Sequence, residues 1–231
     1  MDIIVNLSVE ILMKNQELKL KGMTSNGKGK SSVDSRIMVL GRSAVGKSAL
    51  VVRYLTRRFI WEYDPTLECT YKHQSVVDDE PVTMEILDTA GQDETIHREG
   101  SVRWADGFVL LYAINDRQSF EDITSIKQYI DDTKKTNVQC VLVGTKCDLH
   151  HERVVTTSEG QKLATDMACA FFETSASEGG PEIPELFHEL HREIKRRKLI
   201  ENKPRRRSSA QQVKQVLSKM FIKQNSKNGP S

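Results

Sequence analysis

Cysteine, aromatic residues and long apolar runs are all scarce in this chain of 231 residues. Its four cysteines form no C-x-x-C pair, so free thiols are expected rather than a disulfide framework. No segment approaches the roughly 18 consecutive apolar residues that a membrane-spanning helix needs. The apolar segment 3–13 has no basic leader and contains Glu10, unlike a secretory signal peptide. These absences favour a cytoplasmic protein that folds around a hydrophobic core.

Signals for lipid attachment are also missing. The chain ends in Asn-Gly-Pro-Ser without a C-a-a-X cysteine, and it does not begin with Met-Gly. We therefore expect neither a prenyl nor a myristoyl group.

Charge is unevenly distributed along the chain. Residues 192–231 contain thirteen basic and two acidic residues, a net charge of +11, which leaves a net charge of −9 on the other 191 residues. With a polar, glycine-rich segment near the start, this pattern predicts a flexible leader over 1–35, one domain over 36–200 and a basic tail over 201–231.

The tail leaves several interpretations open. One is that the tail is a solvated, disordered run of charge. The others are that it makes a weak contact with anionic membranes or serves as a nuclear-import signal. Nucleic acid is not expected as a partner, because no aromatic residues are interleaved with the charges. A short basic amphipathic helix is predicted from apolar residues at helical spacing, Val213, Val216, Leu217, Met220 and Phe221.

Among the features that are present, the segment 41–48, GRSAVGKS, matches the phosphate-loop pattern GxxxxGK[ST]. An apolar run over 36–40 precedes it and predicts a buried strand, and a helical pattern over 48–55 follows it. The order strand, loop and helix is the context in which this pattern binds nucleotide phosphates.

Each residue type in the loop suits phosphate chemistry. Gly41 and Gly46 allow the backbone to curl so that its amides point at phosphate oxygens, at the positive end of a helix dipole. Lys47 is expected to reach the β- and γ-phosphates, and the Ser48 hydroxyl to bind Mg²⁺. The loop predicts a nucleotide but does not identify the base.

Strand-like and helical patterns alternate downstream of the loop. Strands are expected over 82–87, 107–114 and 138–144, and helices over 118–134, 157–169 and 182–200. In the second of these helices, Leu163, Met167 and Ala170 are predicted to share one face. The alternation predicts an open, doubly wound α/β sheet, in which ligands bind at the carboxyl ends of the strands.

A second motif, Asp88-Thr-Ala-Gly-Gln92, follows one of those strands. Asp88 stands where a nucleotide site needs a second partner for Mg²⁺. Gly91 suits a backbone that approaches the γ-phosphate closely. Gln92 is able to orient a water molecule for in-line attack.

With both motifs, the chain resembles the Ras family of small GTPases over residues 36–200. The resemblance implies a P-loop GTPase fold, with a mostly parallel six-stranded sheet and helices on both faces. It also implies a monomer that binds GTP or GDP with Mg²⁺, and effector, exchange-factor and GAP proteins at residues 60–69 and 91–100. The stretches FIWEYDPTLE, MEILDTAGQ and RRRSS are most similar to a growth-restraining subfamily.

The resemblance also assigns roles to individual residues. Thr66 is expected to bind Mg²⁺ with Ser48 and Asp88, Phe59 to cover the edge of the base, and Gln92 and Lys47 to serve catalysis. The full set of expected nucleotide contacts is Gly41, Arg42, Ser43, Ala44, Val45, Gly46, Lys47, Ser48, Ala49, Phe59, Thr66, Asp88, Gly91, Thr145, Lys146, Asp148, Leu149, Ser175, Ala176 and Ser177.

Two further loops match the family's guanine-recognition elements. In Thr145-Lys-Cys-Asp148, Asp148 is expected to accept hydrogen bonds from guanine N1 and N2, with the Lys146 stem over the ring. In Ser175-Ala-Ser177, the Ala176 amide is expected to face guanine O6. Because adenine has no donors of that arrangement, Asp148 disfavours a P-loop ATPase or a nucleoside kinase.

Several positions depart from the family pattern. Ser43 and Ala44 stand where Ras has two glycines, which predicts weak acceleration by Ras-type GAPs. Thr145 replaces the usual asparagine, which predicts retained guanine binding with faster exchange. Cys69 replaces a polar residue of the Ras effector loop, which predicts different effectors. The alternative to a slow GTPase switch is a guanine-nucleotide-bound adaptor with negligible turnover.

Overall fold

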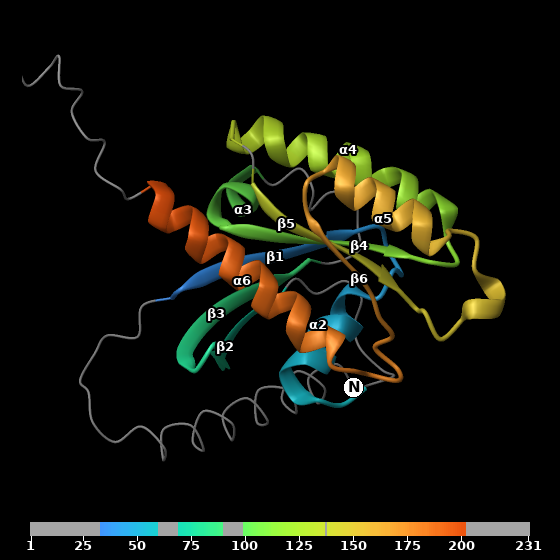
Figure 1. The fold of residues 1–231 in the computed structure, drawn as a ribbon, viewed down its shortest axis with the longest axis horizontal. Helices are drawn as coiled ribbons and strands as arrows, with labels where there is room; N and C mark the ends of the chain where they lie inside the picture. Colours follow the sequence, from blue (N-terminus) through green and yellow to red (C-terminus); the bar gives the residue numbers. More distant parts are fainter. Residues whose placement is uncertain (1–32, 60–68, 90–98, 137, 202–231) are drawn as a thin grey trace, which may run out of the picture. The chain divides into compact units, whose positions relative to one another are not determined.

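The computed structural model describes residues 33–59, 69–89, 99–136 and 138–201. Six strands of this part form one sheet in the order β2-β3-β1-β4-β5-β6 (Figure 1). Only β2 runs antiparallel, to its neighbour β3. The fold class expected from the sequence is thereby confirmed. The strands are β1 (Ser35–Gly41), β2 (Cys69–Val77), β3 (Glu80–Asp88), β4 (Gly107–Ala113), β5 (Gln139–Thr145) and β6 (Ala170–Glu173).

Helices cover both faces of this sheet (Figure 1). They are α2 (Lys47–Thr56), α3 (Glu99–Trp104), α4 (Arg117–Lys134), α5 (Thr157–Asp166) and α6 (Glu182–Glu201), with a short 3₁₀ helix η2 (His150–Glu152). The core between α2, α6 and the sheet is called the first core, and that between α3, α4, α5 and the sheet the second core. Because both faces of β4 are covered, all seven of its residues are buried.

Local sequence signals explain where several elements begin and turn. The Asp116 side chain caps α4, and Thr156 and Glu159 form a reciprocal capping box at the start of α5. Between β2 and β3, Asp78 and Asp79 have φ angles of 52° and 62°. Two consecutive left-handed residues are typical of the tight hairpin turn that matches the twist of the strands.

One helix ends earlier than the sequence indicated. The helix expected over 157–169 stops at Asp166, and Ala168 then turns the chain with a φ of 51°. Leu163 and Met167 both contact the second core, whereas Ala170 begins β6 and contacts the first core. Placing Ala170 on the same face as the other two was therefore wrong, because successive strand residues alternate between faces.

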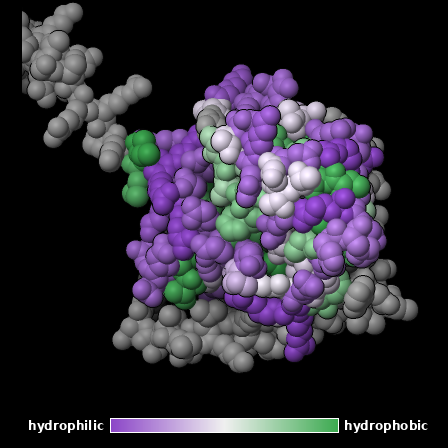
Figure 2. Space-filling view, turned by 45° about the vertical axis from the view of Figure 1, so that its right-hand side comes forward, coloured by the Kyte–Doolittle hydropathy of each residue, from purple (hydrophilic) through white to green (hydrophobic). Residues whose placement is uncertain are grey.

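The chain divides into two units, Met1–Arg196 and Arg197–Ser231. In the second unit the structure describes only the end of α6, where Arg197 donates to Glu201 at 2.8 Å. The boundaries expected at 35/36 and 200/201 stay predictions. Hydrophilic side chains cover most of the face shown in Figure 2. No helix within the described ranges is both long and apolar enough to cross a membrane.

Candidate functional site

The loop between β1 and α2 has the backbone that a phosphate site requires. Gly41 has a φ of 151°, and a Cβ atom there would lie 2.3 Å from the backbone oxygen of Leu111. Gly46, with a φ of 96°, precedes α2 without any side-chain cap. The first amides of α2 are therefore left to bind an anion at the positive end of the helix. Ala44 is also left-handed, with a φ of 62°.

Lys47 is held inside this loop. Its side chain is buried, and its Nζ donates to the carbonyl oxygens of Gly41 at 2.9 Å and Arg42 at 3.0 Å. These bonds fix the ammonium group within the curl of the loop. A positive charge placed there is suited to bind phosphate oxygens.

Asp88, the last residue of β3, combines burial with an unsatisfied oxygen. Its Oδ1 is buried and has no hydrogen-bond partner among the residues that the structure describes. Burial raises its pKa to about 6, while a hydrogen bond with Ser48 and the charge of Lys47 oppose the rise. A buried carboxylate oxygen next to a hydroxyl matches the oxygen ligands that Mg²⁺ prefers. Ser48 and Asp88 thus fit a magnesium ion.

A pocket of about 420 Å³ continues from the phosphate loop toward the ends of β5 and β6. Eleven of its lining residues were expected from the sequence: Ala44, Val45, Gly46, Ala49, Phe59, Thr145, Lys146, Asp148, Leu149, Ala176 and Ser177. Two others, Leu50 and Thr174, were missed. Thr174 directly precedes the Ser175–Ser177 triplet and is buried, so its position next to the motif was the available signal.

Three loops meet around this pocket. The Thr145 hydroxyl lies 2.6 Å from the Val45 carbonyl of the phosphate loop and 2.9 Å from the Tyr112 carbonyl of β4. The Cys147 amide donates to the Thr174 carbonyl at 3.4 Å, which joins the loops after β5 and β6. Thr145, which replaces the family's usual asparagine, therefore makes a hydrogen bond to the phosphate loop.

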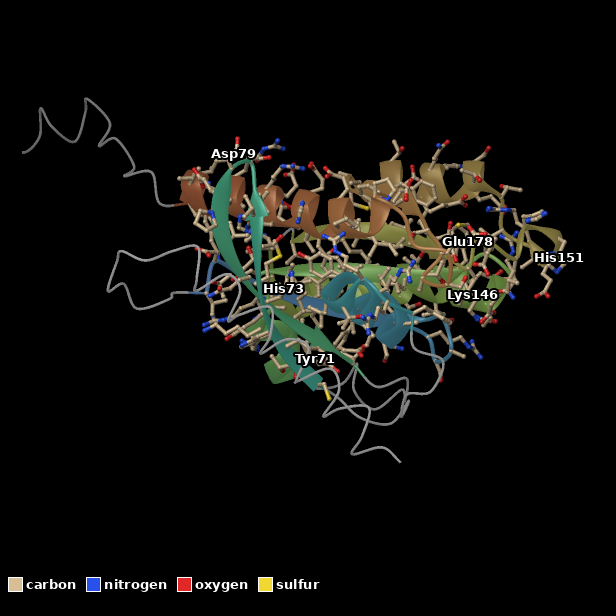
Figure 3. The ribbon with its side chains drawn as sticks, turned by 90° about the horizontal axis from the view of Figure 1, so that it is seen from below. Tyr71, His73, Asp79, Lys146, His151 and Glu178 are labelled. Atoms are coloured by element: carbon tan, nitrogen blue, oxygen red, sulfur yellow. The ribbon has the colours of Figure 1, made fainter. Side chains whose placement is uncertain are left out.

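The loop after β6 is braced from two directions. Ser175 and Ser177 share a 2.7 Å hydrogen bond, and Arg53 of α2 donates to the Glu178 carbonyl at 2.7 Å. Figure 3 shows Glu178 at the same end of the molecule as Lys146, away from Asp79 in the β2–β3 turn. The carboxyl ends of the parallel strands thus gather the site, as expected for a doubly wound sheet.

Some expected contacts lie elsewhere. Thr66, Gly91 and Gln92 fall outside the described residues, as do 60–68 and 91–98 of the expected partner segments. Ser43 is exposed and does not line the pocket. The side chain of Arg42 is directed to Asp122, at 3.1 Å, while its carbonyl holds Lys47.

The Ras family model matches residues 36–196. The chain belongs to the Ras family. It is 58% identical over 193 residues to the Ras-related and estrogen-regulated growth inhibitor of Bos taurus and to that of Homo sapiens, covering 83% of this chain and 97% of each relative. It is 42% identical over 197 residues to the GTP-binding protein Rit2 of Mus musculus, covering 83% and 88%.

Membership of the Ras family identifies the kind of ligand that the chain binds. Ras-family proteins are GTPases that bind GTP and GDP, and this chain is a small GTPase of that kind. The resemblance that its motifs indicated is therefore confirmed. The phosphate loop, Asp88 and the pocket lie together at the carboxyl ends of the strands.

Proposed function

We propose that this Ras-family protein binds GTP with Mg²⁺ and hydrolyses it slowly to GDP, and that the segments 60–69 and 91–100 change their interactions with the bound nucleotide. The observation that carries the proposal is the unpartnered Oδ1 of buried Asp88, hydrogen-bonded through its carboxyl group to Ser48 and near Lys47. A buried carboxylate of that kind is costly unless a cation offsets its charge.

In this proposal, each residue of the site has its own role in GTP hydrolysis. Lys47 and the amides at the start of α2 stabilise negative charge on the phosphoryl group as it is transferred. Ser48, Asp88 and Thr66 would hold Mg²⁺, which supplies charge neutralisation between the phosphates. Gln92 orients the attacking water without acting as a strong base. The roles of Thr66 and Gln92 rest on sequence alone.

Recognition of guanine is assigned to Asp148. A carboxylate accepts both the N1–H and the N2–H of guanine, whereas an amide in its place accepts one hydrogen and donates another. Xanthine presents an oxygen where guanine has its amino group. The Asp148→Asn variant is therefore expected to lose GDP and gain xanthosine diphosphate in competition binding. Retained preference for GDP would contradict this role.

Turnover is tested by single-turnover hydrolysis of preloaded GTP, with the bound nucleotide identified by chromatography at the start and end. We expect guanine nucleotide in the site and conversion of GTP to GDP, with a slower rate in the Gln92→Leu variant. GTP that persists equally in both proteins would instead make the chain a nucleotide-bound adaptor. The exposed Ser43 of the phosphate loop is the observation that favours that second candidate.

The relatives at 58% identity are named as growth inhibitors. We extend this to the chain as a growth-restraining signalling role, exerted through proteins that bind 60–69 and 91–100. Expression of the chain beside its Ser48→Asn variant, which alters the Mg²⁺ hydroxyl, tests the idea in a proliferation assay. Equal growth with both proteins would contradict a nucleotide-dependent restraint.

A further inference from the structure

Two cysteines meet where β5 and β6 begin. Cys140 is the second residue of β5, and Cys169 immediately precedes β6. Val141 pairs with Ala170 in the parallel register, so Cys140 on β5 and Cys169, the residue just before β6, each stand one position before this pair. Adjacent strands lie about 4.7–4.9 Å apart, within the Cα separation that a disulfide spans. Both cysteines contact the second core, which places their side chains on one face of the sheet.

The two thiols are chemically unequal. The Cys140 thiol donates a hydrogen bond to the Cys169 sulfur, which also accepts the Leu142 amide. Together with the positive charge of Lys127, these bonds lower the pKa of Cys169, whereas the same bond and burial raise the pKa of Cys140. Cys140 is buried and Cys169 is partly exposed. This is the division between an attacking thiolate and a resolving thiol.

We propose that Cys140 and Cys169 form a redox site that hydrogen peroxide oxidises to a disulfide. The Cys169 thiolate attacks one peroxide oxygen, the O–O bond breaks, and Cys169 becomes a sulfenic acid as hydroxide leaves. The Cys140 sulfur then attacks the Cys169 sulfur, the S–O bond breaks, and water leaves with the Cys140 proton. Two thiols are oxidised, and one peroxide is reduced to two waters.

The site is connected to nucleotide binding through its two strands. β5 ends at Thr145 and β6 is followed by Thr174 and Ser175, so the base loops extend directly from the linked strands. The hydrogen bond from Cys147 to Thr174 joins these loops across the pocket. A disulfide at the opposite ends restricts relative movement of the strands, and we expect it to slow guanine nucleotide release. This consequence rests on guanine binding at those loops, whereas disulfide formation does not.

The first experiment uses the full chain, reduced and loaded with GDP and Mg²⁺, then treated with hydrogen peroxide and quenched with catalase. Non-reducing peptide mapping is expected to show Cys140 linked to Cys169, and dithiothreitol to reverse the link. The Cys69→Ser variant is the matched control and should form the same disulfide. In Cys140→Val, dimedone should trap a sulfenic acid on Cys169, and circular dichroism should show a folded protein; Cys140→Ala serves if it does not.

Other outcomes overturn the proposal. Cys140 and Cys169 recovered as free thiols, or Cys169 oxidised to sulfinic acid in the parent chain without a link to Cys140, exclude a redox pair. Release of a fluorescent GDP analogue should slow several-fold in the oxidised parent and not in Cys169→Ser. An unchanged rate in fully oxidised protein refutes the coupling to nucleotide. A chain that binds no GDP refutes the proposed function, and the peptide map still decides the disulfide.

Discussion

Thr145 joins the phosphate loop to the strand that carries the base loop. Its hydroxyl reaches the carbonyls of Val45 and Tyr112, both of them in buried residues. Thr145→Val keeps the shape of the side chain but removes its single O–H donor, which leaves one of these two carbonyls without that hydrogen bond, at a cost of about 1–3 kcal/mol. We expect GDP release to accelerate roughly 5- to 100-fold, measured with a fluorescent GDP analogue, because 1.4 kcal/mol is a factor of ten. Thr145→Ser restores the hydroxyl and should release GDP at nearly the parental rate.

Ala44 occupies a conformation that glycine adopts without strain. Its φ of 62° places the backbone in the left-handed region, where the Cβ crowds the following carbonyl oxygen. For a residue other than glycine, this conformation costs about 1–2 kcal/mol. Ala44→Gly should therefore raise the free energy of unfolding by up to about 1 kcal/mol, after the backbone entropy of glycine is subtracted. Urea unfolding in excess GDP measures this, with the GDP affinity of each protein determined separately. Ala49→Gly, inside α2, should have the opposite sign, and a loss of stability in both would contradict the strain.

The residues of the phosphate loop could be predicted because their roles depend on local backbone chemistry. Gly46 is an example, because its left-handed φ of 96° is a property of the loop itself and favours glycine. The hydrogen bond from Thr145 to Val45 crosses 100 positions of the chain and has no local signature. Thr174 was missed although it directly precedes the Ser175–Ser177 motif, because a threonine at that position has no residue-type signature of a pocket contact.

At the scale of elements, β2 is held against α2 and α6 by a group of ring side chains that includes the half-buried His73. Tyr54 stacks on Phe187 with ring centroids 4.1 Å apart, and His73 meets the edge of Tyr54 at 4.9 Å. Figure 3 labels His73 on β2 within this layer of side chains. Burial, together with the smaller effects of the nearby Arg57 and His188, lowers the pKa of His73 to about 4.

This lowered pKa predicts how stability depends on pH. In the unfolded chain His73 binds a proton near pH 6.5, whereas in the folded chain it does so only near pH 4, so the unfolded state gains protons first. The stability that depends on neutral His73 is fully present above pH 6.5 and is lost as the pH falls toward 4. Urea unfolding between pH 7.5 and 4.5 should show this loss, and a shallower loss in His73→Gln. His151→Gln changes an exposed side chain and should keep the parental slope.

Some elements could not be located from the sequence. Four residues of β6 give too short an apolar pattern, and they follow a helix without an obvious break. β2 lies at the edge of the sheet, and its Lys72, His73, Gln74 and Ser75 interrupt any clear run of apolar residues. The strands covered on both faces, β1, β4 and β5, were predicted because continuous burial leaves a continuous apolar run.

At the scale of the whole molecule, the order of motifs along the chain was sufficient to predict a common site. In a doubly wound sheet the carboxyl ends of parallel strands share one edge, so motifs after β1, β3, β5 and β6 must converge. The pairing of Cys140 with Cys169 could not be predicted in the same way. It depends on the register between β5 and β6, and the sequence around the four residues of β6 does not specify that register.

The separation of charge along the chain predicts a reversible contact with anionic membranes. Residues 204–231 contain seven basic and no acidic side chains. Each basic residue near an anionic membrane surface contributes about 1 kcal/mol to the free energy of binding. The full chain should therefore bind vesicles containing phosphatidylserine in a sedimentation assay, and deletion of 204–231 should abolish that binding. Raising the salt concentration should weaken it, since screening shortens the reach of these charges. Neutral phosphatidylcholine vesicles are the control, and equal binding by the truncated chain would contradict a role for the tail.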